Sequence, residues 1–225
     1  MTDFDRHADK YADILDRCVR FTGEGTRYWA ERKAEYLVRL LGAGFQGRTL
    51  DYGCGVGMLS RALVEHLPDV RLDGYDVSEE SLRKLEPGLA SRGTFTTDVG
   101  KLGADYDLIV AANVLHHVEP ARRPATFAAL KDRLRPGGRL AVFEHNPFNP
   151  VTRWIVSECE FDKDAILLPL RETADRMKAS GLEVRRRDYI TFFPGFMSGL
   201  RGLESLLAWC PLGAQYAVLG CRPES

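Results

Sequence analysis

The sequence feature that most constrains the fold is a glycine-rich stretch at residues 49–57, TLDYGCGVG. An apolar approach ends at Asp51 and runs into Gly53, Gly55 and Gly57, and the helical pattern MLSRALVEHL follows directly. Alternate glycines give the backbone conformations closed to residues with a Cβ, so that a ligand can lie against main-chain N–H groups. We therefore expect a strand, a tight turn and a helix arranged around a bound ligand.

The spacing of this turn separates two kinds of ligand site. A dinucleotide fingerprint reads G-x-G-x-x-G and holds a pyrophosphate at the helix N-terminus, whereas this chain has G-x-G-x-G. The charge of Asp51 at the strand end would repel a pyrophosphate and attract an ammonium group. A cationic ligand is favoured, with a nucleotide dehydrogenase and a tight turn of some other α/β protein as the alternatives.

At this point the residues LDYGCGVG resemble the first motif of the class I S-adenosylmethionine-dependent methyltransferases. The resemblance covers the chain from about Lys33 to Cys221. It implies S-adenosyl-L-methionine as cofactor, S-adenosyl-L-homocysteine as product and no metal. It gives Asp51 the methionine amino group, lays the cofactor against Gly53 and Gly55, and gives Lys33 the cofactor carboxylate. A solvated helix lysine is the alternative for Lys33.

The fold implied is α/β, a Rossmann-like sheet of seven mostly parallel strands flanked by helices, with an antiparallel C-terminal strand and helical substrate-side insertions. Expected strands include residues 70–76, 94–99, 106–112, 183–193 and 215–221. Strands alternating with helices demand a parallel sheet whose carboxyl edge binds ligands. Several polar residues fall on that edge, namely Asp51, Asp76, Asp98, Asn113 and Glu144.

Two acids beyond the glycine turn stand where a nucleoside would bind. Asp76 ends its strand, and its carboxylate can accept both ribose hydroxyls because Ser78 already fills the helix-capping role. The resemblance gives Asp98 the adenine amino group, with an ordinary turn aspartate as the alternative. Val77 and Val99 follow these acids and are expected beside the nucleoside, with Val99 against the adenine ring.

The strand expected at 106–112 is followed by the first candidate catalytic residues. The resemblance implies that the backbone at Ala112 and Asn113 faces the cofactor. His116 and His117 follow, and His117 is the one we would consider as a base, although packing is the alternative for both.

Further along, His145 leaves a strand at its carboxyl end and is a candidate general base, with Glu144 as the second choice. Fixing the two Asn-Pro turns is an equal alternative role for His145 and Glu144. In the helix between, Arg122 and Arg123 are expected to be solvated.

The acceptor side is expected to consist of an N-terminal cap and two insertions. The organisation expected is a single domain over residues 1–225, with cap helices at 1–41 and insertions at 145–168 and 194–213. An acceptor is expected to contact Tyr11, Tyr28, His117 and Trp154. The apolar face of 194–213 suits a lid over a hydrophobic acceptor; core packing, a homodimer contact and a membrane-surface contact are the alternatives.

The charge balance of the chain limits the kinds of partner that we expect. Thirty-one basic and 32 acidic residues give a formal charge of −1, so no global field attracts nucleic acid or an anionic membrane. No apolar run reaches the roughly 18 residues of a spanning helix, and the charged beginning resembles no signal peptide, so we expect a cytoplasmic protein. Five scattered cysteines form no zinc or disulfide pattern.

Together these features predict an S-adenosylmethionine-dependent methyltransferase. The methyl group would go to an oxygen, nitrogen or carbon nucleophile of a small, hydrophobic or aromatic metabolite, a natural product or quinone-like compound in a biosynthetic pathway. One alternative is an RNA-nucleotide methyltransferase, disfavoured by the balanced charge and the lack of an N-P-P-Y sequence. The other is a non-catalytic, methyltransferase-like partner protein.

Overall fold

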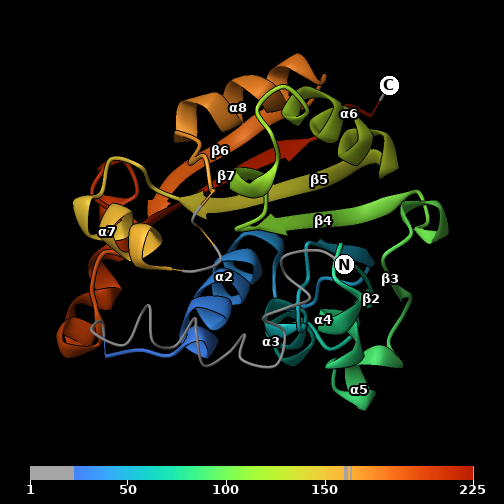
Figure 1. Ribbon diagram of the computed structural model, residues 1–225, viewed down its shortest axis with the longest axis horizontal. Helices are drawn as coiled ribbons and strands as arrows, with labels where there is room; N and C mark the ends of the chain where they lie inside the picture. The colour runs from blue at the N-terminus through green and yellow to red at the C-terminus, as the bar shows by residue number, and fades with distance from the viewer. Residues whose placement is uncertain (1–22, 160–161, 163, 225) are drawn as a thin grey trace.

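The computed structural model describes residues 23–159, 162 and 164–224. Seven strands form one sheet in the order β3-β2-β1-β4-β5-β7-β6 (Figure 1). They are β1 (Arg48–Tyr52), β2 (Arg71–Tyr75), β3 (Phe95–Thr96), β4 (Tyr106–Ala112), β5 (Leu134–His145), β6 (Glu183–Ile190) and β7 (Gln215–Cys221). The first five strands pair in parallel, and β7 is antiparallel to both β5 and β6. The expected fold class is confirmed.

Helices cover both faces of this sheet. They are α2 (Thr26–Leu41), α3 (Met58–His66), α4 (Glu79–Arg83), α5 (Pro87–Ala90), α6 (Arg123–Arg133), α7 (Pro150–Glu158) and α8 (Leu170–Ala179), with 3₁₀ segments η4 (Val99–Lys101), η5 (Leu115–His117) and η7 (Gly195–Leu207). Figure 1 shows α6 and α8 on one face and α2, α3 and α4 on the other. In the described part of the chain, no helix is both long and apolar enough to cross a membrane.

Strand β4 shows why the sheet holds two cores. Successive side chains on a strand point to opposite faces. Leu108 and Val110 join the core that packs on α2 and α3, whereas Ile109 and Ala111 join the core that packs on α6 and α8. All four side chains are fully buried, so β4 is the centre of the molecule and its carboxyl end is firmly placed.

Two predicted strands are shorter in the structure. The strand expected at 94–99 is confined to β3, because Asp98 caps η4 by accepting a hydrogen bond from the Gly100 N–H at 2.8 Å. The strand expected at 183–193 ends at Ile190, because Thr191 has a φ of 62° and turns the chain out of the sheet.

The segment at 194–213 does not pack its apolar residues into the core, so that alternative is wrong for most of them. Phe196, Leu206 and Trp209 are 81%, 69% and 77% exposed. The buried residue of η7 is Glu204, whose carboxylate pairs with Arg32 and accepts hydrogen bonds from backbone N–H groups at 192 and 193. A buried carboxylate therefore fastens the segment and turns its apolar face outward.

Arg123 corrects the expectation that both arginines of this helix are solvated. Its side chain is 1% exposed and donates hydrogen bonds to the carbonyl oxygens of Val118, at 3.0 Å, and Ile166, at 2.5 Å, and to the carboxylate of Glu172 at 3.3 Å. Arg122 is exposed as expected. The charge at the start of α6 is thus used to hold the loop before α8, a contact that the local pattern could not reveal.

Candidate cofactor and acceptor site

The glycine turn adopts the backbone that its sequence predicts. Gly53, Gly55 and Gly57 have φ values of 80°, 53° and 84°, which residues with a Cβ rarely adopt. A Cβ on Gly53 would also lie 2.1 Å from the side chain of Val114, and one on Gly57 would lie 2.6 Å from that of Leu85. Glycine is required by conformation and by space, and the bare backbone opens toward the carboxyl edge of the sheet.

Asp51 and Lys33 are buried behind this turn. Asp51 is 1% exposed and accepts a hydrogen bond from the Ser60 hydroxyl at 2.6 Å. Burial raises the pKa of Asp51 to about 6, although the Ser60 hydrogen bond opposes the shift. Burial lowers the pKa of Lys33 to about 8, against the charges of Glu144 and Asp51. Two opposite charges with little water around them therefore stand at one end of the site.

Asp76 ties the end of β2 to the glycine turn. Its Oδ2 accepts a hydrogen bond from the Gly55 N–H at 2.7 Å and its Oδ1 accepts one from the Ser78 N–H at 2.9 Å. The Ser78 hydroxyl caps α4 by accepting from the Ser81 N–H, as the sequence predicts. Each carboxylate oxygen can accept more than one hydrogen bond, so the arrangement orients Asp76 and still allows hydroxyl donors to bind.

The residues expected around an adenine lie at the neighbouring strand end. Asp98 follows β3 and points its carboxylate at the Gly100 N–H. Val77 and Val99 are 51% and 41% exposed. Each of these apolar side chains is exposed directly after one of the two acids, where a flat ring could cover it.

A cavity of about 190 Å³ lies at the carboxyl edge. It is lined by Thr26, Trp29, Ala30, Lys33, Gly53, Cys54, Val56, Met58, Leu59, Ala112, Asn113, His145, Thr152, Ile155, Cys159, Asp162, Ala214 and Gln215. Five of the predicted site residues meet there, namely Lys33, Gly53, Ala112, Asn113 and His145. The glycine turn thus shares one cavity with α7 of the expected acceptor side.

The described residues expected to contact an acceptor do not meet at this cavity. Tyr28, His117 and Trp154 are not among the described residues that line the cavity, and Tyr11 lies outside the described residues. Tyr28 packs beneath the guanidinium of Arg201, 4.3 Å from its ring centre, and Trp154 is 52% exposed on α7. The sequence missed Trp29, Thr152 and Ile155, which line the cavity; their helical spacing showed amphipathic helices but not which face would meet the site.

Two buried donors near the cavity have no hydrogen-bond partner within the described residues. They are the Tyr28 hydroxyl and the indole Nε1 of Trp29. A buried donor without a partner costs free energy, on the order of 1–3 kcal/mol. Because Trp29 also lines the cavity, its N–H is a suitable donor for a polar ligand atom.

A histidine cluster forms the far side of the site. His116 Nδ1 lies 2.5 Å from Glu144 Oε2, and Glu144 Oε1 accepts hydrogen bonds from the N–H groups of Val114 and Leu115 at 3.0 and 2.7 Å. Burial would lower the pKa of His116, but Glu144 and Asp162 together raise it well above its usual value. The predicted base Glu144 is thus fully buried and engaged with three N–H groups.

The other two histidines have the opposite electrostatic character. Burial, followed by the charge of His116, lowers the pKa of both His117 and His145 to about 4. Both imidazoles are therefore neutral at pH 7 and carry a nitrogen lone pair. His145 lines the cavity, and its ring centre lies 5.3 Å from that of His116.

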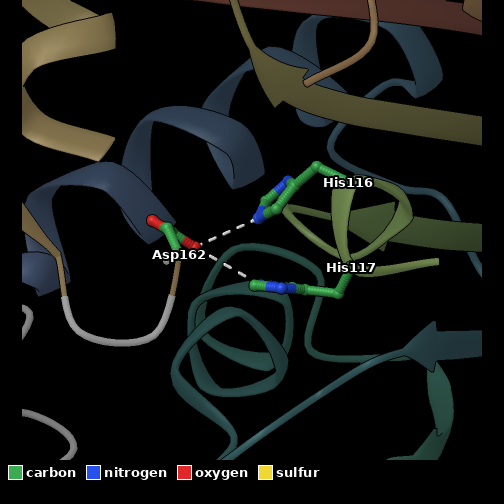
Figure 2. Close-up of side chains that lie close together, drawn as sticks. All are labelled: His116, His117 and Asp162. Atoms are coloured by element: carbon green, nitrogen blue, oxygen red, sulfur yellow. Dashed lines mark hydrogen bonds and ion pairs between the residues drawn. The ribbon is translucent and has the colours of Figure 1, made fainter. Parts of the chain in front are cut away.

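Asp162 completes the cluster, and no local pattern in the sequence predicts it. Its Oδ1 lies 3.3 Å from His116 Nε2 and 3.4 Å from His117 Nε2 (Figure 2). The Asp162 N–H donates to the Cys159 carbonyl, and the Ile166 N–H donates to the His116 carbonyl. Forty-six residues separate Asp162 from His116, so only the fold could bring them together.

Comparison with known proteins agrees with this geometry. Residues 50–140 match the methyltransferase domain family. A curated relative, the ribosomal RNA small subunit methyltransferase C of Klebsiella pneumoniae, is 30% identical over 125 residues, which is 52% of this chain and 36% of that protein. The chain spans at most about a third of the length of the first curated relatives it matches.

Solved structures match over nearly the whole chain. Magnesium protoporphyrin IX methyltransferase from Synechocystis, solved with bound SAH, has a TM-score of 0.66 at 16% identity and covers 95% of this chain and 93% of its own. Phosphoethanolamine N-methyltransferase 2 of Haemonchus contortus, in complex with S-adenosyl-L-methionine, has a TM-score of 0.64 at 16% identity and covers 99% of this chain and 60% of its own. The fold is that of these S-adenosylmethionine-dependent methyltransferases, and residues 50–140 match the methyltransferase domain family.

The site fits the cofactor of that class. Open glycine backbone, a carboxylate at the end of β2 and the buried side chains of Asp51 and Lys33 suit a ligand that carries hydroxyls, an ammonium group and a carboxylate. The Trp29 N–H, which has no partner among the residues that the structure describes, adds a donor at the cavity.

Proposed function

We propose that the chain is an S-adenosylmethionine-dependent methyltransferase whose acceptor is a small, hydrophobic or aromatic metabolite. The observation that carries the proposal is the shared cavity, in which Gly53 and Asn113 face Thr152 and Ile155 of α7. A cofactor held by the glycine turn would therefore present one end to a space lined by a different part of the chain. S-adenosylmethionine supplies an electrophilic methyl carbon there.

Specific residues would hold the cofactor in this proposal. Asp76 would accept hydrogen bonds from the ribose hydroxyls, and Asp98 and Val99 would bind the adenine. Lys33 would pair with the carboxylate, and the buried charge of Asp51 would favour the amino group. Asp51 is not among the described residues that line the cavity, so its contribution would be electrostatic.

The cavity walls support a small and largely apolar acceptor. Trp29, Met58 and Ile155 contribute apolar surface, which suits an apolar acceptor group. The segments 145–168 and 194–213 would lie over the acceptor side of a single domain. An exposed apolar face on η7 agrees with a hydrophobic acceptor, and a homodimer contact remains the alternative use of that face.

Among the predicted catalytic residues, His145 is the best placed to contact an acceptor. Its neutral imidazole lines the cavity and can accept a hydrogen bond from an acceptor hydroxyl. Glu144 would act as a positioning residue, because its carboxylate holds His116 and the turn after β4. Most of the rate enhancement would come from positioning the acceptor and excluding water.

A screen for methyl transfer tests this proposal. The protein and S-adenosylmethionine would be incubated with phenols, quinols, aromatic amines and amino sugars, and in a separate arm with ribosomal RNA. We expect product only with small acceptors, and a fall of about 100-fold or more in kcat with unchanged cofactor binding in His145→Ala. Transfer to RNA alone would overturn the proposed acceptor class, and failure of the folded protein to bind the cofactor would overturn the activity.

A further inference from the structure

The histidine cluster has the composition and spacing of a metal site, in contrast to the sequence-based expectation of no metal. Two imidazoles and one carboxylate converge on one point: His116, His117 and Asp162 each offer a ligand atom, and the three atoms lie within 4.8 Å of one another. Two histidines and one carboxylate form a common ligand set for first-row divalent metals.

The two distances from the carboxylate to the imidazoles are those that a bound ion requires. Ligand atoms bonded at about 2.0–2.1 Å to an ion in tetrahedral geometry lie about 3.3 Å from each other. Asp162 Oδ1 lies 3.3 Å from Nε2 of His116 and 3.4 Å from Nε2 of His117. Figure 2 shows both rings, carried by η5, turned toward the same carboxylate. The three ligand atoms are thus close enough to meet at a single ion.

The surroundings of His116 also fit a ligand. Histidine ligands usually donate their second ring N–H to a carboxylate, which fixes the tautomer and orients the ring. Glu144 lies 2.5 Å from His116 Nδ1 and is itself held by the backbone N–H groups of Val114 and Leu115. This leaves Nε2 of His116 directed at Asp162.

We propose that His116, His117 and Asp162 bind one divalent transition-metal ion of the Zn²⁺ or Fe²⁺ class, with Glu144 as the partner that orients His116. Asp162 also lines the cavity, so the open coordination positions would face the acceptor. If the proposed methyl transfer holds, the ion would bind an acceptor hydroxyl and promote loss of its proton. The metal site itself does not depend on that activity.

The competing account is a proton in place of the ion. A protonated His116 could bridge Glu144 and Asp162 without a metal. In that account the neutral His117 ring would donate its Nε2–H to the same oxygen that His116 contacts, whereas a metal site would use an Nε2 lone pair of each ring. The two accounts differ in whether the chain binds an ion at all.

Cobalt(II) titration separates them. Tag-free, chelator-treated protein would be titrated with Co²⁺, followed by calorimetry and by the visible absorption of bound Co²⁺. We expect one Co²⁺ ion per chain. His117→Ala and Asp162→Ala each remove a ligand, so the affinity for Co²⁺ should fall by at least about 100-fold, the upper end of the range for residues that only hydrogen-bond to a ligand. Glu144→Gln should weaken binding by about 10- to 100-fold.

His66→Ala is the matched control, because His66 is a histidine that pairs with Glu31 on α2, away from the cluster. It should bind Co²⁺ as the wild type does. Thermal unfolding and S-adenosylhomocysteine binding verify that each variant is folded. No Co²⁺ binding by folded wild type, or wild-type affinity in both cluster variants, would overturn the metal site. Cobalt binding without methyl transfer would retain the metal site and remove only the proposed activity.

Discussion

The two sides of the site are built in different ways. On the cofactor side, the contact between Gly55 and Asp76 joins residues 21 positions apart. The positive φ values that the turn needs occur at glycines, which can be recognised in the sequence. On the acceptor side, His116 meets Glu144 and Asp162, 28 and 46 positions away. Local turn chemistry defines the first side, whereas the sheet and the loop before α8 assemble the second. The two sides meet at Val114, which lies against Gly53 and donates its N–H to Glu144, so a change away from Val114 should affect mainly its own side.

Gly53→Val should give the largest loss on the cofactor side. The added Cβ would lie 2.1 Å from the side chain of Val114, and the φ of 80° is strained for valine. We expect affinity for S-adenosylhomocysteine to fall by about 100-fold or more, measured by calorimetry. Gly44→Val is the control, because nothing lies within 4 Å of its added Cβ. Equal affinity in both variants would refute the requirement for glycine.

Arg123→Met tests whether the acceptor side depends on a distant anchor. The substitution removes hydrogen bonds to the Ile166 carbonyl and to Glu172, and we expect the free energy of unfolding to fall by about 2–3 kcal/mol. Affinity for S-adenosylhomocysteine at low temperature should change by less than about threefold. Arg122→Met, on the exposed neighbour, should change stability by no more than about 0.5 kcal/mol. Chemical denaturation of both variants makes the comparison, and equal losses would contradict the anchor.

The pH dependence of cofactor binding should reveal the buried charge of Asp51. Because the folded-state pKa is raised to about 6, the carboxylate is protonated below that pH and loses its attraction for an ammonium group. Affinity for S-adenosylhomocysteine should therefore rise between pH 5 and pH 7, by up to about tenfold, while the ligand's amino group stays charged. Asp51→Asn should bind weakly with a flat profile. A flat profile in wild type would contradict this role.

Features that depend on neighbouring residues could be predicted from the sequence. The sheet, its antiparallel β7 and the glycine turn follow from alternating strands and helices and from residues adjacent in the chain. Asp162 and the buried Arg123 could not be found in this way, because their partners lie in other segments. The apolar residues of η7 were expected from their spacing, but spacing could not tell a buried face from the exposed one observed. The partners of these side chains and the burial of this face depend on contacts between distant segments, which local patterns do not show.

The central claim is that the carboxyl edge of this sheet binds S-adenosylmethionine through Asp76, and calorimetry tests it most directly. Wild type should bind S-adenosylmethionine saturably, and Asp76→Ala should lose about 1–3 kcal/mol of binding free energy, as expected for hydrogen bonds to a charged group. Glu79→Ala, an exposed acid on α4, should bind as wild type does. Absence of binding by folded wild type, or unchanged binding in Asp76→Ala, would contradict the account.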